Sequence, residues 1–342
     1  MMDGYLEQPV ARRRLLCEQA QEQLNLPASS VEKDYWVCWI LRELFGIPGW
    51  GRNLTFKGGT SLSKCWNLIN RFSEDIDIVI GKDFLGSGGQ ASPENAASKK
   101  QRKKRLLSLK KAAQNLIADS LLPTLDERIG LALSTKDNWN LALAPEAEDP
   151  DRQTILFEYP SVLTGAKAYV RSAVKIEMGA RSDNEPAEQR EVHPYLFDVF
   201  PDILGPGKFT VSALCRERTF WEKIMLVHEE NHRPPGEKRR PVRLARHYYD
   251  LWCLITKGVA GRAVEREDIF ARAARHREIY FNRSWMDYST LRRGKLRLVP
   301  LPGQVKEWRK DYQAMSEEMF FGEVPKFEEV LRVVEDFEKK FR

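Results

Sequence analysis

The sequence predicts an α+β fold, with a mixed sheet in the first half of the chain and a mostly helical second half. Two patterns carry this prediction. Strand-like segments of apolar residues lie between residues 53 and 179, and from residue 212 onward apolar residues recur at helical spacing. Of the 342 residues, 42% are hydrophobic and 30% are charged, which is typical of a folded chain long enough for two domains. We expect one domain over 1–208 and a helical domain over 209–342.

Each expected element follows from a local signal. A helix is predicted over 29–45, because Ser29 and Glu32 have the spacing of a capping box, and Pro48 and Gly49 end the pattern. The alternation in EDIDIVI, residues 74–80, is typical of a half-buried strand. The other expected elements are strands over 53–56, 130–143, 154–159 and 168–179, a turn over 58–60, a helix over 61–69, a polar linker running into a basic segment over 81–105, a helix from there to about 121, and helices over 212–230 and 244–255.

Bulk features limit the classes of function. No apolar run approaches the roughly 20 residues that a membrane helix needs, and the N-terminal segment lacks the apolar core of a secretion signal. The five cysteines are odd in number and have no CxxC spacing, so we expect free thiols in a reducing cytoplasm. The net charge of +6 weakly favours a polyanionic partner.

The segment FKGGTSLSK, residues 56–64, has the features of an anion-binding turn. Gly58 and Gly59 allow the backbone to approach a ligand closely, and a helix that begins at Thr60 and Ser61 would direct free N–H groups toward it. Side chains that could add donors to this phosphate site are the two hydroxyls, Lys57 and Lys64. The alternative is an ordinary junction between a strand, a turn and a helix.

Two acids follow this turn, one residue apart. On a strand, Asp75 and Asp77 lie on one face, with Cα atoms roughly 6.5–7 Å apart, while Ile76 and Ile78 lie on the other. Two such carboxylates can hold divalent ions that are bound to phosphate oxygens. The alternative is a solvated acidic edge. Together, the turn and the acids predict binding of a nucleoside triphosphate and its Mg²⁺.

The stretch KGGTSLSK…RFSEDIDI resembles the first motif of the AbiEii/AbiGii-type nucleotidyltransferase toxins, distant members of the DNA polymerase beta nucleotidyltransferase superfamily. The resemblance extends through VKIEMGARSD, RERTFWEKIMLVHE and RHYYDLWCL, and covers about residues 30–260. It implies an N-terminal polymerase-beta-like nucleotidyltransferase domain. It also implies Mg²⁺-dependent transfer of a nucleoside monophosphate to RNA, at the 3′ end of tRNA, which blocks translation until a cognate antitoxin relieves it. Alternatives are transfer to a protein or small-molecule hydroxyl, and a module that binds GTP or another nucleotide without turnover.

The resemblance also implies roles for three further residues. Glu177 matches the third acid of the superfamily, which acts as general base for the attacking hydroxyl; alternatively it belongs to a surface Lys/Glu pair. Lys223 and Asp250 match a functional lysine and a later aspartate of the toxin family, so the helical domain would complete the active site. The lysine would neutralise phosphate charge and the aspartate would orient it or bind metal. The alternatives are a surface lysine and a capping or salt-bridging aspartate.

Two remaining patterns are less specific. His228-Glu-Glu-Asn-His232 matches the zinc motif HExxH, but it lies at the end of its helix before Pro234 and Pro235, so we interpret it as a chance match. Basic clusters at 99–105, 237–247 and 292–297 are typical of solvated faces, and alternatively of an RNA-binding face.

Overall fold

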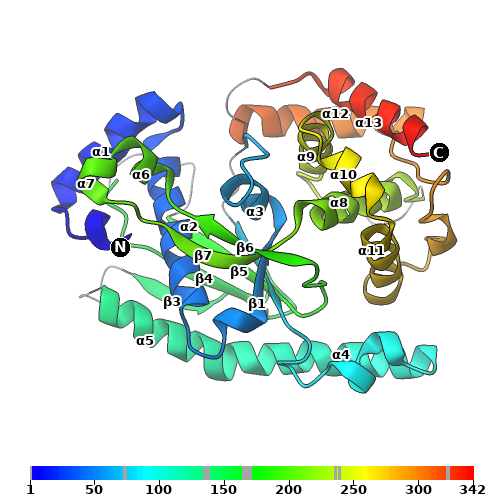
Figure 1. Cartoon of the computed structure of the whole chain (residues 1–342), viewed down its shortest axis with the longest axis horizontal. Helices are drawn as coiled ribbons and strands as arrows, with labels where there is room; N and C mark the ends of the chain where they lie inside the picture. Colours follow the sequence, from blue (N-terminus) through cyan, green and yellow to red (C-terminus); the bar gives the residue numbers. More distant parts are fainter. Residues whose placement is uncertain are drawn as a thin grey trace. The chain divides into compact units, whose positions relative to one another are not determined.

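The computed structural model describes residues 2–71, 75–133, 139–163, 172–234, 237, 240–320 and 324–342, without the side chains of 317 and 318. The chain divides into two units, shown in Figure 1 with their helices and strands labelled. The first unit is Met1–Cys65 with Ser73–Ala213, and the second is Trp66–Phe72 with Leu214–Arg342. The sequence prediction put one division at 208/209. The structure puts it five residues later and assigns a short segment from the first half of the chain to the second unit.

A seven-stranded mixed sheet forms the first unit, in the order β3-β4-β5-β2-β1-β7-β6. Strand β2 pairs in parallel with β5 and antiparallel with β1, which in turn runs parallel to β7. The predicted α+β class and mixed sheet are therefore confirmed. The strands are β1 Leu54–Lys57, β2 Asp75–Ile80, β3 Asn140–Leu143, β4 Thr154–Glu158, β5 Ala173–Gly179, β6 Ala187–Val192 and β7 Phe209–Leu214.

One face of this sheet is apolar and packs against helix α2. Ile76 of β2 pairs with Ile176 of β5, and residues directly opposite on neighbouring strands share a face. Phe157 of β4 lies on the same face and packs against the rings of Trp36 and Trp39 from α2, with centroids 5.8 and 5.9 Å away. Helix α2 therefore covers the apolar face, and the alternate residues of β2 and β5 are left for the opposite face.

The helices of the first unit differ from the prediction at three points. Helix α2 begins at Ala28 without a side-chain cap, so the capping box is wrong. Glu32 is buried instead and accepts hydrogen bonds from Ser161 Oγ at 2.7 Å and Val162 N at 2.6 Å. Helix α3 includes the glycine pair and ends at Lys64, and the predicted basic end of the linker is helical. The helices are α1 Val10–Leu24, α2 Ala28–Phe45, α3 Gly58–Lys64, α4 Lys99–Leu116, α5 Leu122–Ala132, α6 Tyr195–Val199 and α7 Pro201–Leu204.

Helices α4 and α5 form one continuous rod, joined by a π-helical turn over Ile117–Leu121 (Figure 1). Ser98 caps the start of α4 by accepting a hydrogen bond from Gln101 N at 3.2 Å. Residues 130–132 belong to this rod, so the strand predicted over 130–143 is reduced to β3, while residues 134–138 lie outside the described residues. The rod packs through side chains that are fully buried at every fourth position, namely Leu109, Ala113, Ile117, Leu121, Leu125 and Ile129.

The second unit is helical, as the sequence predicts. Its core contains Trp221 of α8, whose ring centroid lies 4.7 Å from that of Phe270 in α11 and 5.0 Å from that of Phe341. Residues 212–214 belong to β7, and α8 begins only at Arg216. The helices are α8 Arg216–Asn231, α9 Arg246–Thr256, α10 Val259–Glu265, α11 Glu267–Tyr280, α12 Pro302–Glu318 and α13 Phe327–Lys340.

Two predictions about the whole chain bear on its class. All five cysteines are buried free thiols, as expected. Among the described residues, no helix combines the length and the apolar character that crossing a bilayer requires.

Candidate active site

The start of α3 lies directly against the carboxylate of Asp77. Gly58 has a φ of 78°, and a Cβ atom placed on it would lie 1.9 Å from Asp77 Oδ2. Lys57, the preceding residue, pairs with Asp77 across the β1–β2 ladder. Only glycine fits both the backbone angle and the space here, so the sequence places an acid and the first N–H groups of a helix side by side.

The two hydroxyls of the predicted phosphate site are engaged with the backbone. Thr60 Oγ1 donates a hydrogen bond to Asp75 O at 2.5 Å, and Ser61 Oγ donates to Gly58 O at 3.0 Å. Both residues are buried. These bonds fix the first turn of α3 against β2, so an anion there would be bound by backbone N–H groups, including that of Gly59, more than by hydroxyls.

Lys64, also predicted to contact phosphate, is placed elsewhere. Its side chain is 3% exposed, and its ammonium contacts Asp34 Oδ1 at 2.8 Å. The same ammonium lies 3.4 Å from the centroid of the Tyr195 ring, and Asp34 also accepts a hydrogen bond from Tyr195 N. Although burial alone would lower the pKa of Lys64, the Asp34 carboxylate raises it above its ordinary value. Lys64 therefore holds α3 to α2 and α6.

The acidic side chains Asp75, Asp77 and Glu177 form a row across two neighbouring strands, β2 and β5. Asp77 pairs with Glu177 of β5, and Asp75 pairs with Lys175, so all four project from the face opposite α2. Both aspartates are half-buried, while Ile76 and Ile78 are buried. The arrangement that the alternation of β2 predicts is present in the structure.

A cavity of about 250 Å³ opens beside this row. Lys57 enters it and donates to Ser182 Oγ at 3.2 Å. One wall is the loop before β4, where Asp149 accepts backbone N–H bonds from residues 151, 153 and 154. Burial alone would raise the pKa of Asp149, but these bonds outweigh it and lower the pKa. The lining residues are Lys57, Asp77, Ile78, Asp149, Asp151, Gln153, Thr154, Glu177, Met178, Gly179 and Ser182.

Lys175 lies beside the acidic row and is the lysine of the Lys/Glu pair that the sequence offered as the alternative role of Glu177. It forms an ion pair with Glu177, and the side chains of both residues are more than a third exposed. Burial would lower the pKa of Lys175, but the bond to Glu177 and the charges of Glu177 and Asp75 raise it. The lysine is therefore held protonated. Its position, two residues before Glu177 on the same strand, is the spacing from which the sequence predicts this pair.

The acidic row suits a hard divalent cation that arrives with phosphate. Carboxylate oxygens are the ligands that Mg²⁺ prefers, and Mg²⁺ usually takes only one or two of them from a protein. Within the described residues, no three His, Cys, Asp or Glu side chains gather closely enough to hold a metal ion by themselves. Asp75 and Asp77 would therefore need phosphate oxygens and water as the remaining ligands.

Lys223 and Asp250 meet in the core of the second unit. Lys223 Nζ donates to Asp250 Oδ2 at 2.7 Å, and Arg71 binds both oxygens of the same carboxylate at 2.7 and 2.9 Å. Burial would raise the pKa of Asp250, but the two cations lower it well below its usual range. Burial, together with the charge of Arg71, lowers the pKa of Lys223. Arg71 has no role in the sequence prediction, because its partner Asp250 is 179 residues away.

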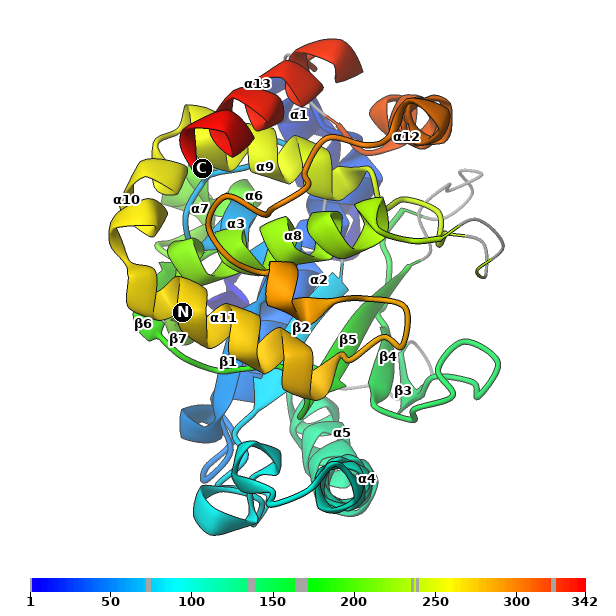
Figure 2. The ribbon, with the colours of Figure 1, turned by 90° about the vertical axis from the view of Figure 1, so that its right-hand side faces the viewer.

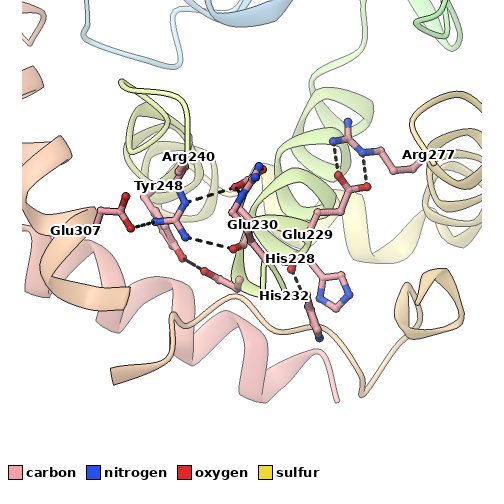
Figure 3. A network of polar contacts seen from close by, with 10 residues as sticks. His228, Glu229, Glu230, His232, Arg240, Tyr248, Arg277 and Glu307 are labelled. Atoms are coloured by element: carbon pink, nitrogen blue, oxygen red, sulfur yellow. Dashed lines mark hydrogen bonds and ion pairs between the residues drawn. The ribbon is translucent and has the colours of Figure 1, made fainter. Parts of the chain in front are cut away.

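The HExxH residues form a polar network of their own in the second unit (Figure 3). His228 is fully buried; its Nε2 lies 3.0 Å from Thr290 Oγ1, and its Nδ1 accepts from Arg297 N at 2.8 Å. Both nitrogens that could bind a metal are thus within hydrogen-bond distance of protein groups. The other pairs are Glu229 with Arg277, Glu230 with Arg233 and Arg240, Asn231 with Tyr248, and His232 with the His228 carbonyl.

Comparison with known proteins gives the class of this protein. Residues 39–339 match a protein-family model described as nucleotidyl transferase AbiEii toxin, type IV TA system. That span includes the glycine pair, the acidic row and the Lys223–Asp250 pair, and the protein is therefore a nucleotidyltransferase. More particularly, the chain belongs to the AbiEii family of nucleotidyltransferase toxins of type IV toxin–antitoxin systems.

Two further comparisons are less informative. Among solved structures, MenT4, a nucleotidyltransferase toxin from Mycobacterium tuberculosis H37Rv, is similar over 92% of this chain and 94% of its own, with 16% sequence identity and a TM-score of 0.42. No curated protein sequence matches the chain.

Proposed function

We propose that this toxin transfers a nucleoside monophosphate from a nucleoside triphosphate to RNA, at the 3′ end of tRNA, with Mg²⁺ as cofactor. Blocking this end would stop translation in the cytoplasm until a cognate antitoxin relieves the arrest. The observation that supports the proposal best is the contact between Gly58 and Asp77. It puts a carboxylate beside backbone donors at the edge of a cavity, as a metal-bound triphosphate requires.

The first unit would supply the groups that bind the nucleotide and the metal, and the general base. Backbone N–H groups of 58–61 would bind the triphosphate, with Lys57 as a further cation. Asp75 and Asp77 would hold Mg²⁺, which when bound supplies positive charge to the phosphate oxygens. Glu177 would accept the proton of the acceptor hydroxyl as the new O–P bond forms at the α-phosphorus. The bond from the α-phosphorus to the bridging oxygen breaks, and its electron pair leaves with pyrophosphate.

Lys223 and Asp250 belong to the second unit, and their part in the reaction is an inference from the family. Asp250 would orient Lys223, which would neutralise charge that develops on the phosphates. The 2.7 Å hydrogen bond between them supports the orienting role. Arg71 shares the carboxylate and would act as a positioning residue, because it fixes Asp250 from the other side.

The reaction is tested by incubating the purified protein with total tRNA and each α-labelled nucleoside triphosphate in turn, with and without Mg²⁺. We expect label on tRNA, release of pyrophosphate, and loss of both when Mg²⁺ is omitted. Label on protein or on a small molecule would replace RNA as the acceptor. Binding of nucleotide without pyrophosphate release would contradict the proposed turnover.

A further inference from the structure

Helix α4 carries a concentration of positive charge that no acid on the helix balances. Eight of its 18 residues are Lys or Arg, and none is Asp or Glu. Five lysines are exposed, and in the part of the chain that the structure describes none of them lies within ion-pair distance of a carboxylate. The exposed lysines are Lys99, Lys100, Lys103, Lys104 and Lys111.

Four of these lysines form a single stripe. At about 100° per residue, Lys100, Lys103, Lys104 and Lys111 lie within a narrow sector of the helix surface, opposite the buried Leu109. The stripe is about 16 Å long, given the rise of an α-helix. We call these four residues the α4 stripe. In Figure 2 the rod of α4 and α5 is seen end-on.

This distribution of charge opposes the stability of the helix. Lys99 and Lys100 occupy the first turn, where the helix dipole disfavours cations, and Lys100 and Lys104 are like charges one turn apart. The like charges of the stripe repel one another, and the field they create is complementary to a polyanionic ligand that lies along the helix.

The same helix is tied to the cavity of the candidate active site. Lys110 forms an ion pair with Asp151, and Gln114 Nε2 donates to Asp151 O at 2.7 Å. Asp151 and Asp149 belong to the loop that forms one wall of the cavity. A ligand on the α4 stripe is therefore bound by an element that is fixed to the wall of the reaction site.

We infer that the α4 stripe binds the phosphate backbone of the RNA acceptor and holds it beside the cavity. The inference rests on the proposed function, since it names the surface that takes the RNA substrate. Lysines that contact phosphates bind without sequence preference and release counterions, so the affinity depends strongly on salt.

The test uses two variants of the whole chain. In the stripe variant, each lysine of the α4 stripe is replaced by Gln. In the matched control variant, four exposed lysines of the second unit are replaced by Gln. Binding of a fluorescein-labelled RNA hairpin with a single-stranded 3′ end is measured by anisotropy, without nucleotide, from 50 to 200 mM KCl. Transfer to a short unstructured RNA acceptor is measured separately. The control variant changes Lys306, Lys310, Lys326 and Lys340 to Gln.

The salt slope is the slope of log affinity plotted against log salt concentration. We expect its magnitude to be smaller by about three to four in the stripe variant than in wild type. Its affinity deficit relative to wild type should shrink by about a hundredfold between 50 and 200 mM KCl. The control should keep the wild-type slope. The unfolding midpoint of the stripe variant should equal or exceed that of wild type, because like charges have been removed from the helix.

Three results would overturn the inference. The first is an unchanged salt slope in the stripe variant. The second is an equal loss in the control variant. The third is binding of polyglutamate as tight as that of the hairpin, which would indicate an acidic protein as the partner. Failure of the proposed function is a separate result, because wild type would then bind the hairpin without labelling any RNA.

Discussion

Replacing Gly58 by Ala should separate the chemistry of the site from the stability of the fold. The new Cβ would lie 1.9 Å from Asp77 Oδ2, whereas real Cβ atoms essentially never approach another heavy atom below 3.0 Å. The carboxylate must therefore retreat by about 1 Å. A misplacement of about 1 Å near a reacting centre costs about 100-fold in rate. The left-handed backbone adds a stability cost of about 1–2 kcal/mol.

The control for this substitution is Gly49→Ala. Gly49 has a φ of 79°, almost equal to that of Gly58, but a Cβ there would meet nothing within 4 Å. Both variants should therefore lose similar free energy of unfolding in urea, and only Gly58→Ala should lose transfer, measured as pyrophosphate release at saturating nucleotide. Wild-type transfer by Gly58→Ala, in a protein that remains folded by circular dichroism, would refute the proposed position of Asp77.

Three further predictions concern charged groups. Asp75→Ala or Asp77→Ala should abolish transfer and toxicity with little change in the unfolding midpoint, because neither half-buried acid supports the core; wild-type rates in either would exclude them as metal ligands. Asp250→Asn should cost about 3–5 kcal/mol of unfolding free energy by leaving two buried cations unpaired, whereas Asp268→Asn, which breaks an exposed ion pair, should leave the unfolding midpoint almost unchanged. Burial, with the charges of neighbouring groups, lowers the pKa of His228 to about 3. The unfolded chain thus binds the proton more tightly, and wild type should lose stability as pH falls from about 6.5 toward 3. A His228→Gln variant should lose less unfolding free energy than wild type over the same pH range. Equal losses for the two proteins, measured by urea titration, would contradict the attribution of this pH dependence to His228.

The parts of the structure that short-range patterns predict are those with strong local signals. The alternation of β2 determines which face carries Asp75 and Asp77, because the side-chain period of a strand is fixed. Strand β6 was missed because it is mostly exposed, so its sequence AEQREV shows no apolar alternation. The strand predicted over 130–143 is wrong at 130–132, because these residues continue a helical rod whose buried positions begin far upstream.

The contacts that short-range patterns did not predict join residues distant in sequence. Lys64 follows the glycine pair on the same short helix, which led to the predicted phosphate contact, yet its partner Asp34 lies on another helix. Arg71 was passed over for the same reason. Local sequence identifies a charged residue, but whether that residue forms a buried ion pair depends on tertiary contacts that only the structure shows.

The segment Trp66–Phe72 belongs to the second unit, although the chain before and after it belongs to the first. This order has a consequence for synthesis of the chain. Arg71 leaves the ribosome long before Asp250, which follows 179 residues later. Until Asp250 has been synthesised, the guanidinium of Arg71, which is buried in the folded protein, lacks the carboxylate that pairs with it. The second unit therefore cannot complete its core before residue 250 has been synthesised. A single proteolytic cut between residues 213 and 214 would separate Trp66–Phe72 from the rest of the second unit.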